Sequence, residues 1–271
     1  MTTGWHLRCR RATPLRLDLR SLSPAAMAGL SQAEAARLPV WHGNEALELG
    51  EVFMLAPHAD GELLLEGDLA KADRIGWQLA GGRIRVEGDA GDYLGAGMSG
   101  GEIVASGHAG ALAACEMSGG RLEIAGNAGD FAASALPGSM DGMRGGTLLV
   151  RGSVGARFAD RMRRGSALVF GNAGDFVASR MVAGTVAVAG RVGAHAGLGM
   201  RRGTLVLLQA PPAPLPTFAA TAYDFGVIWG LLARDIARAG GPFVGLPTAR
   251  PQRLVGDLSA EGKGELLLLA A

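Results

Sequence analysis

Arginine side chains that recur at fixed places in the middle of this chain offer its clearest binding chemistry. Between Arg144 and Arg202 there are ten arginines and two aspartates. Because guanidinium groups bind carboxylates through paired hydrogen bonds, this series favours an acidic partner or the anionic tail of a ligand. A solvated or salt-bridging face is the plainer interpretation. One group opens successive repeats and the other precedes a methionine: Arg144, Arg163, Arg164, Arg201 and Arg202, then Arg161 and Arg180.

Residues for catalysis are sparse. No His/Cys spacing is typical of a metal site, and no base pattern accompanies Ser99 or Ser118 as a nucleophile. The G-x-x-G units do not lead from a strand into a helix, as a phosphate loop would. We therefore expect no catalytic residue, no metal and no cofactor on this chain. The histidines are scattered: His6, His42, His58, His108 and His195.

A repeat of 19 residues must position the arginines. A fixed period near 20 residues is typical of a solenoid. Seven extra residues, Pro137 to Met143, interrupt the period, and a truncated seventh copy starts at Arg202. The six longer copies span residues 81–98, 100–117, 119–136, 145–162, 164–181 and 183–200.

Each copy opens with a short segment of alternating apolar residues, such as Ile84 and Val86, which predicts a strand with its apolar side inward. The rest of each copy is too short and too rich in glycine for a helix. These features predict an all-β protein: a right-handed β-helix of about seven coils, with neighbouring coils pairing at ~4.8 Å.

Glycines fall in columns when the copies are aligned. Tight corners need positive φ or a close approach of two backbones, and glycine supplies both. A methionine column at the ends of the copies, including Met98 and Met117, is expected to stack inside. The two corner columns are Gly88, Gly107, Gly126, Gly152, Gly171 and Gly190, and then Gly91, Gly110, Gly129, Gly155, Gly174 and Gly193.

Alternate copies also carry an aspartate followed by an aromatic residue. Aromatic rings two coils apart lie ~9.5 Å apart, too far for direct stacking. The pattern indicates either a face presented to a partner or local packing in which the aspartates cap turns. The residues are Asp92, Tyr93, Asp130, Phe131, Asp175 and Phe176.

The two ends of a solenoid must be capped, and this divides the chain into three parts. Residues 1–57 form an N-terminal cap segment, residues 58–209 the β-helix, and residues 210–271 a proline-rich exit, a helix and a final strand. Apolar spacing predicts the helix over residues 219–239 and the final strand over residues 262–270.

Composition limits the partners and the compartment. The net charge is +1 and aromatic residues make up 5%, which argues against nucleic acid. No uninterrupted apolar stretch reaches ~18 residues, so no membrane span is expected. The N-terminus lacks the apolar stretch of a signal peptide, and Cys9 and Cys115 make no disulfide framework. A cytoplasmic protein is the simple interpretation.

The repeated GxxGxxxG phrase, complete as GDAGDYLG (88–95) and GRVGAHAG (190–197), resembles the GXGXG β-helix domain that ends the large subunit of glutamate synthase. Together with HGNEALELGEVFMLA (42–56) and the tail GKGELLLL, the stand-alone chain resembles the family formed by the C subunits of formylmethanofuran dehydrogenases. That family includes the C subunit of the formyltransferase/hydrolase complex of methylotrophic bacteria. The resemblance covers roughly residues 40–270, and the arginine- and alanine-rich composition favours the bacterial complex.

The resemblance implies a non-catalytic β-helix subunit. Its partners would be an amidohydrolase-like subunit, a formyltransferase subunit and a molybdopterin-subunit-like chain. The complex would move formyl from formyl-tetrahydromethanopterin to a methanofuran analogue and release formate, with zinc and the analogue on the partner subunits. The acidic glutamyl tail of such carriers gives the arginines a ligand. The C subunit of a molybdenum or tungsten formylmethanofuran dehydrogenase, a self-standing enzyme and a free polyanion-binding module remain alternatives.

Overall fold

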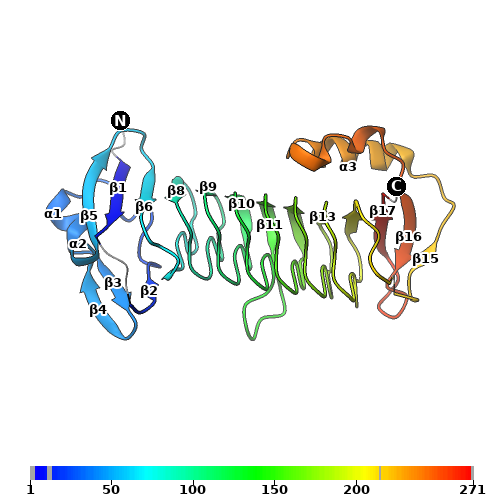
Figure 1. Cartoon of the computed structure of the whole chain (residues 1–271), viewed down its shortest axis with the longest axis horizontal. Helices are drawn as coiled ribbons and strands as arrows, with labels where there is room; N and C mark the ends of the chain where they lie inside the picture. The colour runs from blue at the N-terminus through cyan, green and yellow to red at the C-terminus, as the bar shows by residue number, and fades with distance from the viewer. Residues whose placement is uncertain (1–3, 11–13, 214, 270–271) are drawn as a thin grey trace.

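The computed structural model describes residues 4–10, 14–213 and 215–269. The chain is mostly β, as predicted, and forms an elongated body (Figure 1). Its main sheet has thirteen strands in the order β15-β16-β17-β14-β13-β12-β11-β10-β9-β8-β6-β1-β5. A second sheet of four strands, β4-β3-β2-β7, lies at the N-terminal end. Residues 1–3, 11–13, 214 and 270–271 of the predicted cap, exit and final strand lie outside the described residues.

Each 19-residue repeat contributes one strand to the main sheet. Neighbouring repeats pair in parallel and in register, so Ile84 lies opposite Ile103 and Leu122 opposite Leu148. A second ladder of isolated parallel bridges joins the same repeats, beginning at Ala90↔Ala109. The strands are β8 (Arg83–Glu87), β9 (Glu102–Ala105), β10 (Ser118–Ile124), β11 (Arg144–Val150), β12 (Arg164–Val169), β13 (Thr185–Val188) and β14 (Thr204–Leu207).

The inward positions of these strands form a continuous core. Ile84, Val86 and the equivalent residues of later repeats are fully buried. Apolar burial of this extent is the main stabilising contribution that such a chain has. Six methionines, one per repeat, are also completely inaccessible to solvent: Met98, Met117, Met143, Met162, Met181 and Met200.

The seven-residue insertion ends one residue earlier than the sequence alignment suggested. Met143, predicted to be the last inserted residue, occupies the interior methionine position of the third repeat. The Arg163 N–H donates to Met143 O at 2.8 Å, as the Ser118 N–H donates to Met98 O in an earlier repeat. Burial of a large side chain therefore sets the boundary, and Met140 at the tip stays 72% exposed.

The N-terminal segment caps one end of the main sheet. Strand β1 inserts between β5, to which it is antiparallel, and β6, to which it is parallel. Two short helices, α1 and α2, pack beside β5, and β2 and β3 begin the second sheet. The elements are β1 (Gly4–Cys9), β2 (Leu17–Asp18), α1 (Gln32–Ala36), β3 (Pro39–His42), β4 (Glu45–Glu48), α2 (Leu49–Val52), β5 (Phe53–His58), β6 (Leu63–Glu66) and β7 (Ala72–Asp73).

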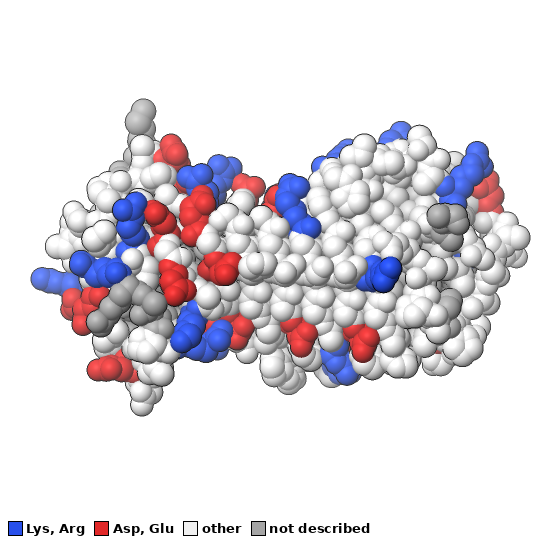
Figure 2. All heavy atoms as spheres, viewed as in Figure 1, with Lys and Arg blue, Asp and Glu red and all other residues white. Residues whose placement is uncertain are grey.

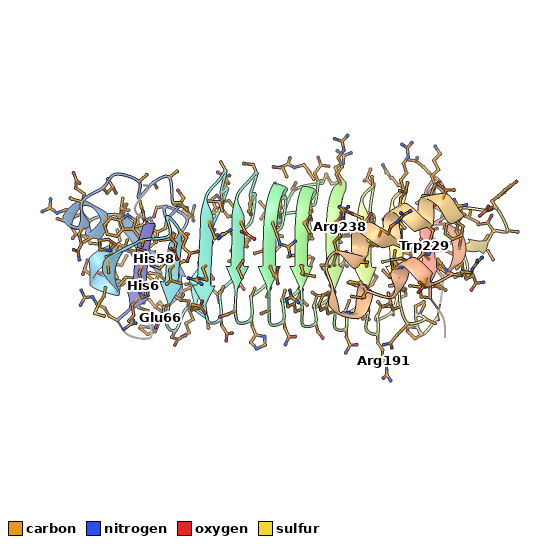
Figure 3. All side chains as sticks on the ribbon, turned by 90° about the horizontal axis from the view of Figure 1, so that it is seen from above. His6, His58, Glu66, Arg191, Trp229 and Arg238 are labelled. Carbon is orange, nitrogen blue, oxygen red and sulfur yellow. The ribbon has the colours of Figure 1, made fainter. Side chains whose placement is uncertain are left out.

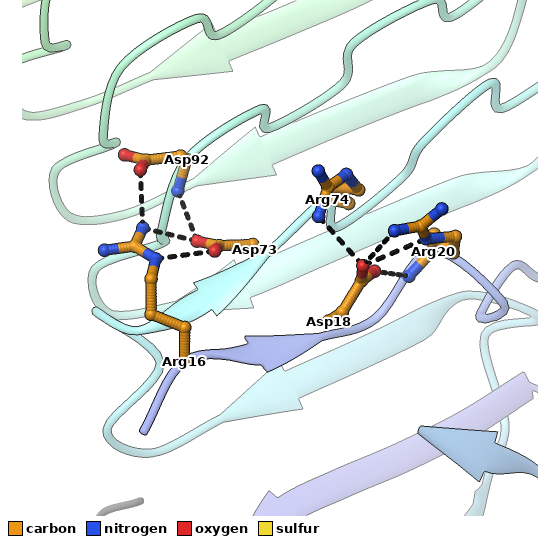
Figure 4. A network of polar contacts seen from close by, with 6 residues as sticks. All are labelled: Arg16, Asp18, Arg20, Asp73, Arg74 and Asp92. Carbon is orange, nitrogen blue, oxygen red and sulfur yellow. Dashed lines mark hydrogen bonds and ion pairs between the residues drawn. The ribbon is translucent and has the colours of Figure 1, made fainter. Parts of the chain in front are cut away.

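Ion pairs join this cap to the first repeats (Figure 4). Arg16 donates to both oxygens of the nearly buried Asp73, at 2.6 and 2.5 Å, and lies 2.7 Å from Asp92. On the other side of β2, burial raises the pKa of Asp18, but hydrogen bonds from Arg20 and the charge of Arg74 outweigh it and hold that pKa below its ordinary value.

The C-terminal segment returns to the main sheet. The helix predicted over residues 219–239 is shorter, because its first residues form β15, which pairs with β16. The prediction of a final strand is confirmed, and this strand pairs in parallel with β14. The elements are β15 (Ala219–Ala220), α3 (Gly226–Ala237), the short 3-10 turns η1 (Gly241–Phe243) and η2 (Leu246–Thr248), β16 (Gln252–Gly256) and β17 (Gly264–Leu268).

Helix α3 covers the outward face of the last strands (Figures 1 and 3). Trp229 and Ile236 pack with outward residues such as Leu149, Leu168 and Val206 in a second buried cluster. The strands from β11 onward therefore have apolar residues on both faces, and they depart from the predicted alternation.

Charges are unevenly spread over the surface. Figure 2 shows acidic and basic atoms crowded together over the N-terminal third and few charges over the middle of the face in view. Across the ranges that the structure describes, no helix has the length and hydropathy needed to cross a membrane.

Candidate functional site

Five of the seven predicted arginines line one groove. Its volume is about 550 Å³. The arginines come from the starts of β11 and β12 and from the turn before β14. All lie on the side of the main sheet where these parallel strands begin. The lining residues are Arg144, Arg163, Arg164, Val182, Ala183, Arg201, Arg202 and Glu261.

The repeat fixes the spacing of these arginines. The backbone N–H of Arg163 donates to Met143 O, and that of Arg201 donates to Met181 O, each at 2.8 Å. These two positions are two repeats apart, or ~9.6 Å at the usual strand spacing. Val182, from the repeat between them, has no charge, so it provides an apolar floor between two basic pairs.

The groove carries more positive than negative charge. Arg163 lies 3.1 Å from Asp141 of the insertion, whereas Arg201 lies 4.0 Å from Glu261. Arg144 is 3.9 Å from Glu116. These pairs are half-exposed, and such pairs contribute little to stability. Two further arginines have no ion pair within the described part of the chain: Arg164 and Arg202.

The other two predicted arginines, Arg161 and Arg180, lie outside the groove and face a buried carboxylate. Arg180 donates to both carboxylate oxygens of Asp160, at 3.0 and 2.7 Å, and Arg161 lies 3.8 Å from it. Asp160 is only 4% exposed and also accepts a hydrogen bond from Ser179. A buried carboxylate needs charged or hydrogen-bonding partners. Arg161 and Arg180 therefore serve as counter-ions to Asp160 of the same chain.

Both glycine columns lie where the backbones of adjacent repeats nearly touch. A Cβ on Gly107 would lie 2.5 Å from Gly88 O, and one on Gly155 would lie 2.8 Å from Asp130 N. Of the twelve glycines, only Gly88 has a positive φ, at +125°. Positive φ instead recurs at the aromatic position, including Tyr93 at +63°. Close approach, rather than φ, thus demands glycine in eleven of the twelve positions.

Polar side chains between the glycines hold each repeat to the next. The Asp89 carboxylate accepts the N–H of His108, and Nδ1 of His108 accepts the N–H of Asn127, at 2.7 and 2.9 Å. Alignment already showed acceptor side chains after the first glycine, but sequence reasoning missed their role. Asp92, Asp130 and Asp175 act in the same way, and the acceptors of the first column are Asp89, His108, Asn127, Ser153 and Asn172.

Side chains from neighbouring repeats contact the recurring aromatic rings and form a ladder with them. The Arg157 guanidinium lies 5.9 Å from the Phe131 ring centroid and 4.8 Å from that of Phe176. The Phe176 ring stacks on His195 at 4.9 Å. Cation–π and stacking contacts of this kind stabilise a surface column. The ladder and the aspartate bonds fit the local-packing interpretation.

No described cysteine or histidine lies in the arginine groove. Burial, with a smaller contribution from Glu116, raises the pKa of the Cys115 thiol to about 12. A thiol with that pKa stays protonated at neutral pH and is a poor nucleophile. The groove offers fixed positive charge and hydrogen-bond donors, a combination suited to binding anions rather than to bond-breaking chemistry.

Comparisons with known proteins decide the family. The family model of the GXGXG motif matches residues 65–212, more than half of the chain. The chain belongs to the GXGXG family. A crystal structure of the formyltransferase/hydrolase complex (FhcABCD) from Methylorubrum extorquens with methylofuran contains a chain that superposes with a TM-score of 0.92. The two chains are 41% identical, and the match covers 98% of this chain and 100% of the other.

Curated GXGXG relatives match over a shorter stretch. The C subunit of the formyltransferase/hydrolase complex from Methylorubrum extorquens is 43% identical over 88 residues. The C subunit of a molybdenum-containing formylmethanofuran dehydrogenase from Methanosarcina barkeri is 34% identical over 87 residues. These matches cover 32% and 30% of this chain, and the chain spans about a third of each of these relatives.

Proposed function

We propose that this chain is the non-catalytic scaffold subunit of a formyltransferase/hydrolase complex. The observation that carries the proposal is the 41% identity to a chain of such a complex over 98% of this chain. The complex would transfer formyl from formyl-tetrahydromethanopterin to a methanofuran analogue and release formate. Zinc and the carrier would be held by partner subunits, and the buried, unreactive Cys115 supports a structural role for this chain.

The proposed partners are an amidohydrolase-like subunit, a formyltransferase subunit and a molybdopterin-subunit-like chain. Affinity purification of the tagged chain from its native host, followed by mass spectrometry, tests this. We expect those three partners in fixed ratio, formyl transfer by the complex and no turnover by the isolated chain. Recovery of the chain alone would overturn the scaffold proposal. Recovery with a molybdenum or tungsten oxidoreductase would favour the dehydrogenase alternative, to which the weaker matches belong.

We further propose that the main sheet is part of a right-handed β-helix and that the chain divides at residues 1–57, 58–209 and 210–271. Two parallel ladders joining the same repeats, and a methionine inside each, support this proposal. A cytoplasmic location completes it, since Cys115 is a buried free thiol. A crystal structure of the purified chain would test the handedness directly.

The arginine groove is the proposed contact for the acidic tail of the carrier. Its two basic pairs, ~9.6 Å apart along the strand stack, suit carboxylates spaced along an extended chain. Replacing Arg163 and Arg164 by Ala should weaken binding about tenfold and reduce its salt dependence. Replacing the exposed Arg191 and Arg238 by Ala removes the same charge outside the groove and should change binding little. Equal effects of both pairs, or none, would refute a specific tail site.

A further inference from the structure

The turn between β5 and β6 gathers three side chains that can each donate one ligand atom to a metal ion. His58 ends β5, and Asp60 and Glu62 follow it at alternate positions before β6 begins. Their ligand atoms all lie within 4.8 Å of one another. Gly61 has φ of +68°, a conformation that glycine adopts readily, and this keeps the turn tight. Figure 3 shows the labelled His58 beside His6 and Glu66 at this end of the molecule.

The distances suit a tetrahedral ion. His58 Nε2 lies 3.3 Å from Glu62 Oε1 and 3.7 Å from Asp60 Oδ2. An ion with bonds of about 2.0–2.1 Å to nitrogen and oxygen separates tetrahedral ligand atoms by about 3.3–3.4 Å. Two edges of the site are therefore nearly formed. The Asp60 side chain is 73% exposed, so a small rotation can adjust the longer edge.

The surrounding charge favours a cation. This end of the molecule gathers four carboxylates and the guanidiniums of Arg8 and Arg85. The carboxylates are those of Asp60, Glu62, Glu66 and Glu87. With neutral histidines, the local net charge is −2. One imidazole and two carboxylates form a nitrogen and oxygen donor set, which suits zinc better than calcium or magnesium.

Arg85 is the competing partner. Its Nη2 lies 2.6 Å from Glu62 Oε1, the same oxygen that faces His58. Within the described ranges, the second oxygen of Glu62 has no protein partner. An ion on Oε1, the oxygen that forms the 3.3 Å edge with His58, would therefore displace Arg85 Nη2, and the guanidinium would move to the second oxygen. The Glu62 side chain is only 6% exposed, which limits competition from water.

We propose that His58, Asp60 and Glu62 bind one Zn²⁺ ion, with water at the fourth position. The ion would join the end of β5, the outermost strand of the main sheet, to the start of β6. Because all three ligands come from this one turn, the ion would fix the conformation of the turn. His6, whose ring centroid is 6.3 Å from that of His58, would stay with Glu66, 2.8 Å from its Nε2.

Titration calorimetry of the purified full chain with zinc chloride, after treatment with a chelator, tests the proposal. We expect about one ion per chain, and at least tenfold weaker binding in His58→Ala and in Asp60→Asn. His195→Ala, which removes an exposed imidazole far along the sheet, should bind like the parent chain. Because Asp60 is exposed and makes no packing contact that the fold needs, weaker binding in Asp60→Asn cannot be attributed to misfolding.

X-ray absorption at the zinc edge gives a second readout. We expect one imidazole nitrogen and oxygen ligands, with the imidazole contribution lost in His58→Ala. The proposal is overturned if no saturable binding occurs, or if His58→Ala and Asp60→Asn bind zinc as tightly as the parent chain. Such a result would leave the three residues as an ion-pair network with Arg85.

Discussion

Gly110 provides a sharp test of the claim that close backbone approach demands glycine. Its N–H donates to Ala90 O and Gly91 O at 3.1 and 3.0 Å. A Cβ at this position would lie 2.8 Å from Gly91 C and 2.9 Å from Asp92 N, distances that real Cβ atoms essentially never show. Because those atoms are backbone, Gly110→Ala must push two repeats apart.

The expected cost follows from two contributions. Overpacking a tight contact costs ~2 kcal/mol, and weakening a hydrogen bond between the repeats costs ~1 kcal/mol. Gly110→Ala should therefore lower the free energy of unfolding by about 3 kcal/mol, measured by urea denaturation of the full chain with circular dichroism. Gly81→Ala is the matched control. No atom lies within 4 Å of the corresponding Cβ, and φ is outside the left-handed region, so we expect a change of at most ~1 kcal/mol, stabilising if anything.

A second variant separates the side chain from the backbone. Asp92 Oδ1 is the atom nearest to the Cβ position of Gly110, but a side chain can rotate away. If the backbone contact dominates, combining Asp92→Ala with Gly110→Ala should not restore stability. The reasoning is refuted if Gly110→Ala is as stable as Gly81→Ala, or if the added Asp92→Ala rescues it.

Three further predictions concern the core, the C-terminal cap and the covering helix. Met143→Ala should destabilise the chain by ~2–5 kcal/mol, whereas Met140→Ala, three residues away and exposed, should have almost no effect in the same denaturation assay. Burial raises the pKa of Asp257, but hydrogen bonds from Ser259 and the Gly199 N–H outweigh it and hold the pKa below its ordinary value. The carboxylate therefore stabilises the fold above about pH 4 and loses this effect as the pH falls through its native pKa; Asp257→Asn should cost ~2 kcal/mol at pH 7, and the difference should shrink in acid. Val227 and Leu231 are 80% and 63% exposed on α3, so replacing both by Ser should leave the thermal midpoint unchanged but reduce co-purification of partner subunits, and unchanged co-purification would exclude this face as a contact.

The sequence predicted the repeating strands well because each depends on local alternation and on neighbours one period away. The start of α3 was predicted too early because Ala219–Ala220 pairs with Leu254 and Val255, a contact more than thirty residues distant. The covered outer face had a visible sign, since Leu148, Leu149 and Val150 are apolar in succession where an exposed strand would alternate.

The groove was predictable only in part. Aligned columns brought Arg163 and Arg201 to one edge, because the period fixes which residues stack. The contribution of Glu261 comes from the tail, whose path no repeat dictates. The separate role of Arg180 required the buried Asp160, the one charged residue in an aligned column that otherwise holds Ala96, Cys115, Ser134, Ser179 and Leu198. The His58 turn carries no familiar ligand spacing, so only coordinates reveal its convergence.

The hydrogen bonds accepted by the two columns of acceptor side chains between the glycines all run in one direction along the chain. Asp89 accepts from His108, and Asn127 accepts from Ser153, so in these bonds the acceptor always precedes its donor along the chain. A ribosome releases the acceptors first, and each new repeat emerges to find them already in place. Within the described residues, Arg191 is the last donor to the first acceptor column and Ala194 the last donor to the second. Each repeat added during synthesis can therefore bond to acceptor side chains of the repeat before it, and the series ends after the last repeat that carries such acceptors.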